Sequence, residues 1–173
     1  MSISDPMKMF DVAGKTAVST GAAGAFGRVA ARVVAGAGCK LGLVAGNAEA
    51  LESIASECRD GGAEVHTINA RPTDETACAD MMAAAVEAFG SLDILVVASG
   101  MNKVAKIDEM APDTFTAVMD ANVTQSWLLA RAATSVMKAQ GTGGKVVLVS
   151  SARGLLGHPA GYTAYCASKA AVD

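Results

Sequence analysis

The chain has 173 residues, enough for one domain with a buried core, and 51% of them are apolar, which excludes a disordered chain. The net charge is −3 without a run of basic residues, so a small molecule is a better candidate partner than nucleic acid or a membrane. The first ten residues lack the apolar region of a secretion signal, no later run approaches a membrane span, and four dispersed cysteines indicate reduced thiols in a cytoplasmic protein.

Short runs rich in branched apolar residues predict five β-strands. They cover 16–20, 40–45, 64–69, 93–99 and 145–150. Several of these runs are apolar without alternation, as expected for strands that are covered on both faces of a parallel sheet.

Stretches with helical spacing fill the intervals between the strands. Apolar stripes run through 51–58 and 78–89, and Thr73 occupies the position of an N-cap before the second stripe. Gly90 marks the exit of that helix. The segment 112–140 carries apolar residues on more than one side, so we expect it to be buried or shared with a partner chain.

Strands and helices therefore alternate along the whole chain, and a further helix begins after the fifth strand. This order implies right-handed crossovers and an α/β fold with a doubly wound parallel sheet of the Rossmann type. We interpret residues 1–173 as a single domain. The two histidines, His66 and His158, are too few to suggest a metal site.

The segment TGAAGAFG at 20–27 joins the first strand to the first helix. Glycine lets the backbone turn tightly and approach a ligand, and a helix N-terminus offers free N–H groups to a pyrophosphate. A tight turn with no ligand is the alternative interpretation. The position within the first βαβ unit favours a dinucleotide site.

Tyr165 and Lys169 stand one helical turn apart near the end of the chain. Residues i and i+4 share a helix face, so the ammonium can lie near the phenol and favour its ionised form. Such a phenol can take or give a proton near neutral pH. The alternative is a chance pair on an exposed helix, which contributes about 0.2–0.5 kcal/mol.

From about Phe10 to its last residue, the chain resembles the short-chain dehydrogenase/reductase family. The resemblance rests on the glycine turn, ANV at 121–123, VSSARG at 149–154 and GYTAYCASKAAV at 161–172. It implies hydride transfer between NAD(P) and a secondary alcohol or ketone. Sugars, polyols and 3-oxoacyl thioesters are the substrate classes that it suggests.

The family's catalytic roles fall on four residues of this chain. The resemblance implies that Tyr165 is the general acid/base and that Lys169 binds the nicotinamide ribose and lowers the tyrosine's pKa. It further implies that Ser151 holds the substrate oxygen and that Asn122 supports a proton-relay water.

The serine assignment has an alternative in Ser150. Neighbouring strand residues point to opposite faces, so only one of Ser150 and Ser151 is expected to enter the cleft. The usual family spacing to Tyr165 is one residue shorter than that of Ser151 and falls on Ala152. We expect the 157–165 loop to absorb the extra residue, and we favour Ser151.

The cofactor motifs depart from the family pattern. Ala25 replaces the middle glycine, Ser99 stands in a segment where asparagines are usual, and Arg71 replaces an acidic residue that contacts adenine. Gly46, at the end of the second strand, supplies neither the Asp of NAD enzymes nor the Arg of NADP enzymes. Without a repelling carboxylate, and with Arg28 or Arg71 in reach of a 2′-phosphate, the sequence favours NADP and leaves NAD open. The cofactor-binding residues predicted in this way are Gly21, Gly24, Ala25, Phe26, Gly27, Gly46, Arg71, Ser99, Gly100, Tyr165 and Lys169.

The chain also stops earlier than the family does. Members normally add two more strands, a substrate loop and an oligomer edge, so the domain is expected to be incomplete at its C-terminus. We expect strand 145–150 to be an unpaired edge, and apolar surface on the last helices to lie open. A partial sequence or truncated product of a full-length homo-oligomeric enzyme, a dimer or tetramer, is the favoured interpretation of this early end. A native short form stabilised by dimerisation is the alternative. For the function, the alternative to an enzyme is a truncated, catalytically inactive family member that acts as a nucleotide-binding or oligomerising module.

Overall fold

A five-stranded parallel sheet forms the centre of the computed structural model, which describes residues 6–173. Its strands are β1 (Thr16–Thr20), β2 (Lys40–Val44), β3 (Val65–Ile68), β4 (Ile94–Val97) and β5 (Lys145–Leu148). Their order across the sheet is β3-β2-β1-β4-β5, so the chain order reverses next to β1. The predicted Rossmann-type sheet is confirmed, although β4 and β5 end at Val97 and Leu148 rather than at 99 and 150.

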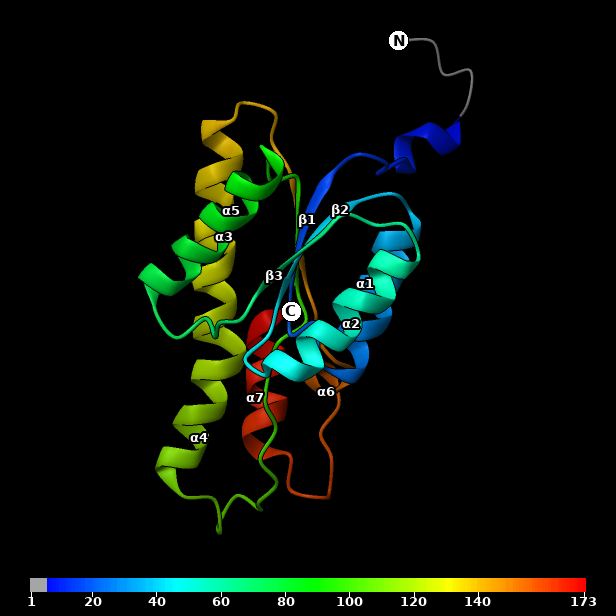
Figure 1. Cartoon of the computed structure of the whole chain (residues 1–173). Helices are drawn as coiled ribbons and strands as arrows, with labels where there is room; N and C mark the ends of the chain where they lie inside the picture. The colour runs from blue at the N-terminus through cyan, green and yellow to red at the C-terminus, as the bar shows by residue number, and fades with distance from the viewer. Residues whose placement is uncertain (1–5) are drawn as a thin grey trace.

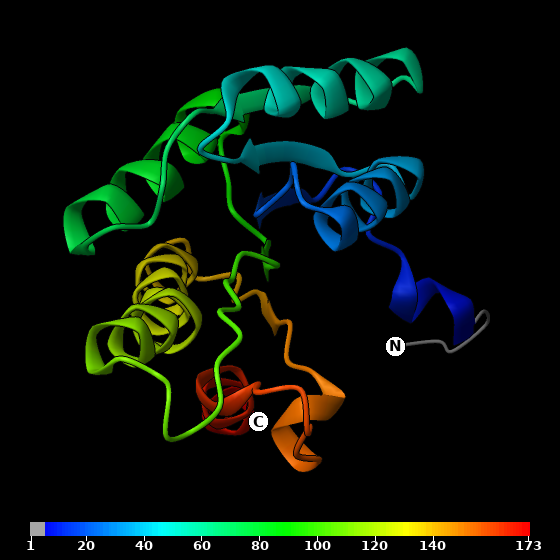
Figure 2. The same ribbon diagram turned by 90° about the horizontal axis from the view of Figure 1, so that it is seen from below.

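Helices cover both faces of the sheet (Figure 1). They are η1 (Pro6–Phe10), α1 (Ala25–Gly36), α2 (Ala48–Asp60), α3 (Glu75–Phe89), α4 (Pro112–Met119), η2 (Asp120–Thr124), α5 (Gln125–Ala139), α6 (Ala152–Leu155) and α7 (Thr163–Val172). The pair α1 and α2 lies on one face, and α3, α4 and α5 lie on the other. Seen from below, α7 lies between α4–α5 and α6 (Figure 2).

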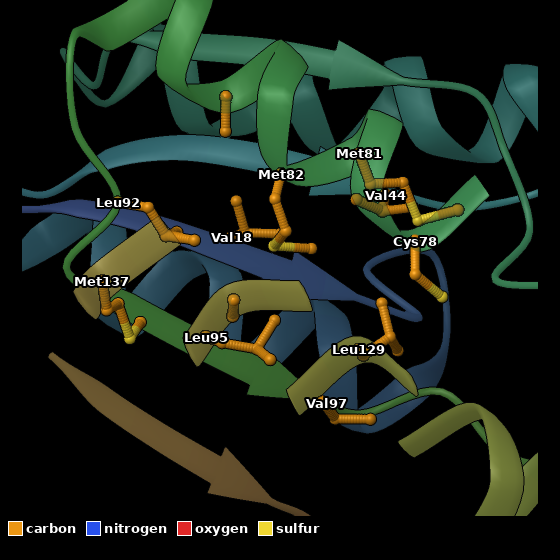
Figure 3. Close-up of a cluster of buried hydrophobic side chains, with 12 residues drawn as sticks. Val18, Val44, Cys78, Met81, Met82, Leu92, Leu95, Val97, Leu129 and Met137 are labelled. Atoms are coloured by element: carbon orange, nitrogen blue, oxygen red, sulfur yellow. The ribbon is translucent and has the colours of Figure 1, made fainter. Parts of the chain in front are cut away.

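Two apolar clusters fill the space between the sheet and these helices. On the α3 and α5 side, Met81, Met82 and Leu129 pack against Val18 and Leu95 of the central strands (Figure 3). On the other side, the largest buried side chains belong to β2 and α2: Leu41, Leu43, Leu51 and Ile54. Aromatic residues make up only 4% of the chain, so aliphatic and methionine side chains do this packing. Each such buried side chain stabilises the fold by about 1.5–3 kcal/mol relative to exposure.

The N-cap of α3 is Asp74, so the prediction of Thr73 is wrong by one residue. Asp74 Oδ1 accepts a hydrogen bond from the backbone N–H of Ala77 at 2.9 Å, whereas Thr73 Oγ1 donates to Asp74 Oδ2 at 3.0 Å. The Ala77 amide holds the pKa of Asp74 below its usual value, with help from Thr73. Gly90 ends the helix at φ 83°, as predicted.

The segment 112–140 is helical almost throughout but is interrupted by η2, a π-helical turn. One side of it is buried through Val118, Leu129 and Met137. Phe115 and Trp127 remain 38% and 59% exposed. The segment is therefore buried on one side and exposes apolar residues on another, and cover by a partner chain stays a prediction.

Within residues 6–173, β5 pairs with β4 alone and forms one edge of the sheet. Its residues Val146, Val147 and Leu148 are 38%, 48% and 38% exposed. Leu155 and Leu156, around the end of α6, are 84% and 61% exposed. The predicted open edge and the open apolar surface beside it are both present.

In the same described part of the chain, no helix combines the length and apolar character that a membrane crossing needs.

Candidate active site and nucleotide groove

The glycine turn between β1 and α1 has two positions where a side chain does not fit. Gly21 adopts φ +68°, and a Cβ there would lie 2.6 Å from the backbone nitrogen of Ser99. A Cβ on Gly27 would overlap the carbonyl oxygen of Gly21. Gly24 is the N-cap of α1 and has no side chain to occupy the first N–H groups of the helix. The turn therefore presents bare backbone at a helix N-terminus, the arrangement that suits a pyrophosphate.

A groove of about 800 Å³ opens at the carboxyl ends of β1, β2 and β4. These strands flank the point where the strand order reverses, which is where doubly wound sheets bind ligands. Six of the predicted cofactor-binding residues line the groove: Gly21, Gly24, Gly46, Arg71, Ser99 and Gly100. The bare glycine turn and the size of the groove both fit a nicotinamide dinucleotide.

Five predicted cofactor residues do not line this groove. Gly27 is buried beneath the turn, and Ala25 and Phe26 are exposed on the first turn of α1. Tyr165 and Lys169 lie next to the groove rather than in its wall. A Cβ built on Gly100, a groove residue, would be 3.9 Å from Lys169 Nζ, so the lysine reaches the rim.

Ser99 links two strand ends where the family usually has asparagine. Its hydroxyl lies 3.0 Å from the Thr20 hydroxyl, so a hydrogen bond joins the end of β1 to the loop after β4. Asn69 Nδ2 donates to the carbonyl of Ala45 at 2.9 Å and joins the ends of β3 and β2 in a similar way. The floor of the groove is therefore fixed by short polar side chains.

The two candidate arginines differ in availability. Arg28 is bound to Glu57 together with Arg32 and also donates to Ser53 Oγ at 3.0 Å. The guanidinium groups of Arg32 and then Arg28 hold the pKa of Glu57 below its usual value. Arg71 packs over Gly46, and none of the ion pairs found within residues 6–173 involves it. Of these two arginines, Arg71 is the one that lines the groove, and its guanidinium has no ion-pair partner within residues 6–173.

Tyr165 and Lys169 share one face of α7, as their spacing predicted. Lys169 Nζ lies 5.7 Å from the centre of the Tyr165 ring and donates a hydrogen bond to the carbonyl of Val149 at 2.7 Å. Only 6% of Lys169 is exposed. Burial lowers the pKa of Lys169 below its usual value, and the carboxylate of Asp173 acts in the opposite direction.

Ser150 and Ser151 both follow the end of β5, so the alternation of a strand does not separate them. Ser150 Oγ donates to the backbone carbonyl of Lys169 at 3.1 Å and is thereby committed to α7. Ser151 Oγ accepts from the N–H of Arg153 at 3.2 Å, as the N-cap of α6. An oxygen that accepts this bond keeps its own proton for another acceptor, so Ser151 retains a donor.

Asn122 lies in the π-helical turn η2 and is buried. Its Oδ1 accepts from the N–H of Met101 at 2.7 Å, and its Nδ2 donates to the Met101 carbonyl at 2.9 Å and to Ser168 Oγ at 2.8 Å. Ser168 Oγ in turn donates to the Tyr165 carbonyl at 2.8 Å. The amide therefore ties η2 to the loop after β4 and to α7.

Two residues beside this site were missed from the sequence. Ser168 is a buried residue of α7 with a hydroxyl group. Its position one residue before Lys169 is the feature of the sequence from which it could have been found. Tyr162 lies against Tyr165, with ring centres 6.1 Å apart and an interplanar angle of 80°.

Within residues 6–173, no group of three or more His, Cys, Asp or Glu residues is placed to hold a metal ion.

The family model described as short chain dehydrogenase matches residues 15–173. Uncharacterized oxidoreductase Rv1714 of Mycobacterium tuberculosis is 49% identical over 164 residues, which cover 95% of this chain and 60% of that protein. L-rhamnose 1-dehydrogenase (NAD(P)(+)) of Azotobacter vinelandii is 34% identical, over 83% of this chain and 57% of that protein.

Solved structures agree with this match. A short-chain type dehydrogenase/reductase from Mycobacterium marinum superposes with a TM-score of 0.93 at 32% identity, covering 99% of this chain and 69% of that one. An NAD+-bound xylitol dehydrogenase gives 0.88 at 30% identity, covering 92% of this chain and 61% of that one. The chain spans about 60% of the length of two curated relatives that it matches at 49% identity.

Proposed function

Because the chain belongs to the short-chain dehydrogenase family, we propose that its protein is an NAD(P)-dependent oxidoreductase acting on a secondary alcohol or ketone. The observation that carries the proposal is the placement of Lys169 Nζ 5.7 Å from the centre of the Tyr165 ring, next to the glycine-lined groove. The cofactor supplies or accepts the hydride when bound. The chain's own residues bind it, orient the substrate oxygen and move a proton.

Each residue has a distinct part in this proposal. During reduction, Tyr165 Oη gives its proton to the substrate oxygen while Ser151 Oγ donates a hydrogen bond to the same oxygen. Lys169 Nζ, held on Val149, favours the ionised phenol by its charge and binds ribose hydroxyls. Asn122 supports a relay water while its amide holds α7 in place. In the oxidation direction, Tyr165 takes the proton back.

We propose two candidate substrate classes: sugars or polyols, and 3-oxoacyl thioesters. Relatives of both kinds match the chain: an L-rhamnose 1-dehydrogenase and, at 32% identity, a 3-oxoacyl-[acyl-carrier-protein] reductase of Rickettsia conorii. We further propose a cytoplasmic homo-oligomer, a dimer or a tetramer, and residues 1–173 as one domain.

The test is turnover of the chain with NADPH or NADH and a panel of both substrate classes, together with the variant Tyr165→Phe. We expect this variant to lose turnover by about a hundredfold or more, because the proton donor is gone. Cofactor binding, measured by calorimetry, is expected to stay within about twofold, because the groove is intact. Undiminished turnover in the variant would remove Tyr165 from the proposed role.

A nucleotide-binding module without turnover is the second candidate. It is favoured by the exposed edge of β5. A chain that gains thermal stability with NADPH or NADH but turns over no substrate would support this second function. A folded chain that responds to neither cofactor would contradict both candidates.

The cofactor is proposed to be NADP, with Arg71 as the group that distinguishes it from NAD. Arg71→Gln is expected to weaken NADPH binding about tenfold, since a charge-assisted hydrogen bond to the 2′-phosphate is lost. NADH binding is expected to be unchanged, because NADH has no such phosphate. Arg59→Gln, on the exposed part of α2, is the matched control. Equal losses for the two cofactors would contradict the assignment.

A further inference from the structure

The candidate catalytic phenol, Tyr165, belongs to a row of four side chains in contact. The His158 ring stacks on the Tyr162 ring, with centres 4.6 Å apart and planes inclined by 19°. Tyr162 meets Tyr165 edge to face at 6.1 Å and 80°, and the ammonium of Lys169 lies on the Tyr165 ring at 5.7 Å. Offset stacks and edge-to-face pairs are the arrangements that aromatic rings prefer. The Tyr165 ring is therefore contacted by both an aromatic ring and a cation.

The backbone around Tyr162 is fixed by a neighbouring loop. Ala105 donates its N–H to the Gly161 carbonyl at 2.9 Å and accepts from Thr163 Oγ1 at 3.2 Å. Gly161 adopts φ +79°, and a Cβ there would come within 2.8 Å of the Ala105 carbonyl carbon. Contacts on both sides of Tyr162 thus hold its backbone in place, and its ring packs between those of His158 and Tyr165.

On the far side of Tyr162, the His158 ring is also held. Its Nδ1 accepts a hydrogen bond from the N–H of Ala160 at 3.1 Å, which fixes the imidazole within the 157–162 loop. The Tyr162 hydroxyl, in contrast, makes no hydrogen bond within residues 6–173. The contact that Tyr162 offers is consequently that of its ring.

We propose that Tyr162, backed by His158, is a positioning residue that sets the orientation of the Tyr165 ring. This inference rests on the proposed function, because the orientation matters where Tyr165 Oη transfers a proton to a bound substrate. Proton transfer needs the two oxygens within hydrogen-bond reach, and a small misplacement of the phenol costs rate. In this proposal the Lys169 ammonium supplies a charge beside the Tyr165 ring, and the edge-to-face ring of Tyr162 limits the rotation of that ring.

The first test compares Tyr162→Leu with Tyr162→Phe in steady-state kinetics. We expect Tyr162→Leu to lower kcat about tenfold and to leave the KM for the nucleotide unchanged, because the groove does not include Tyr162. Tyr162→Phe keeps the ring and is expected to restore kcat to within about twofold. In a second pair of variants, His158→Ala is expected to lower kcat. Its control is His66→Ala, which removes an exposed histidine on β3 and is expected to leave kcat unchanged. Equal kcat in the Leu and Phe variants would overturn the proposal.

The second test does not depend on turnover. The chain has two tyrosines, so both Tyr162 variants leave Tyr165 as the single tyrosine in a nuclear magnetic resonance spectrum with labelled tyrosine rings. We expect Tyr162→Phe to keep the ring-current shift of the Tyr165 signals and Tyr162→Leu to lose it. His158→Ala gives the same readout if Tyr162→Leu does not fold. Unchanged Tyr165 signals in a folded Leu or Ala variant would overturn the inference. Absent turnover in the unmodified chain, together with the expected shifts of the Tyr165 signals, would contradict only the proposed function.

Discussion

Lys169 carries an ammonium that is 6% exposed, and its position is set by the Val149 carbonyl and the Tyr165 ring. Burial disfavours the charged form, and one nearby carboxylate, Asp173, partly offsets this effect. The charged form of Lys169 is therefore less favourable in the folded chain than in the unfolded chain. Its ionisation should therefore appear in the pH dependence of folding.

We expect the free energy of unfolding to rise, relative to Lys169→Met, as the pH increases toward the ordinary lysine value of about 10.4. The folded-state pKa is lowered, so between the folded and unfolded values the unfolded chain binds more protons and stability increases with pH. The gain is about 1.4 kcal/mol for each unit by which the pKa is lowered. Denaturant titrations of both proteins from neutral to alkaline pH measure the difference; a constant difference would contradict the buried-charge interpretation.

The pairing of Tyr165 with Lys169 could be predicted because it follows from helix geometry alone. The choice between Arg28 and Arg71 could not, since Arg28 is occupied by Glu57, a residue on another helix. The choice of Ser151 over Ser150 stays a prediction, but the structure changes the reason for it. The alternation of strand residues requires a strand through 150, but β5 ends at Leu148, and the hydrogen bonds of Ser150 and Ser151 now distinguish them.

At the scale of elements, α3 begins with two polar residues that compete for one cap. Asp74 takes the position because its carboxylate reaches the Ala77 N–H, and Thr73 then supports the carboxylate. Both residue types are common N-caps, so the sequence alone did not separate them. The boundary is settled by which side chain faces the first turn of the helix.

Asp74→Ala is expected to lower the melting temperature by a few degrees at neutral pH, because the cap and a favourable charge at the helix N-terminus are both lost. Thr73→Ala, which removes only the support, is expected to have a smaller effect. The pKa of Asp74 is lowered in the folded chain, so its contribution exists above the unfolded value of about 3.9 and disappears as the pH falls through the folded value. Thermal melts of both variants at neutral and acidic pH measure these effects. A larger decrease in melting temperature for Thr73→Ala than for Asp74→Ala would show that Thr73 is the N-cap.

The order of helices and strands could be predicted from the sequence, but the π-helical turn in the 112–140 segment could not. Apolar periodicity predicts a helix but carries no signal for the π-helical turn, which depends on Asn122 reaching Met101 and Ser168. Those partners lie in the loop after β4 and in α7. The π-helical turn therefore coincides with tertiary contacts of Asn122, which the apolar periodicity of its own segment does not encode.

At the scale of the whole molecule, the sheet is well covered on the β1 side and open at β5. The central strand β1 is buried throughout, whereas all four residues of β5 are exposed. An exposed strand edge with apolar side chains is a template for pairing with another chain. The same edge lies close to Ser150 and Ser151, so association there would act on the candidate site as well.

Val147→Lys is expected to weaken self-association of the chain without loss of its melting temperature, because a lysine on an edge strand opposes further strand pairing. Val147 is already 48% exposed, so the substitution removes little core packing. We expect the concentration needed for association to rise about tenfold, which corresponds to roughly 1.4 kcal/mol. Sedimentation or light scattering over a concentration series measures it. Val33→Lys, at a residue of α1 that is 66% exposed, adds the same charge away from the sheet edge. If both variants associate alike, the general charge and not the β5 edge governs assembly.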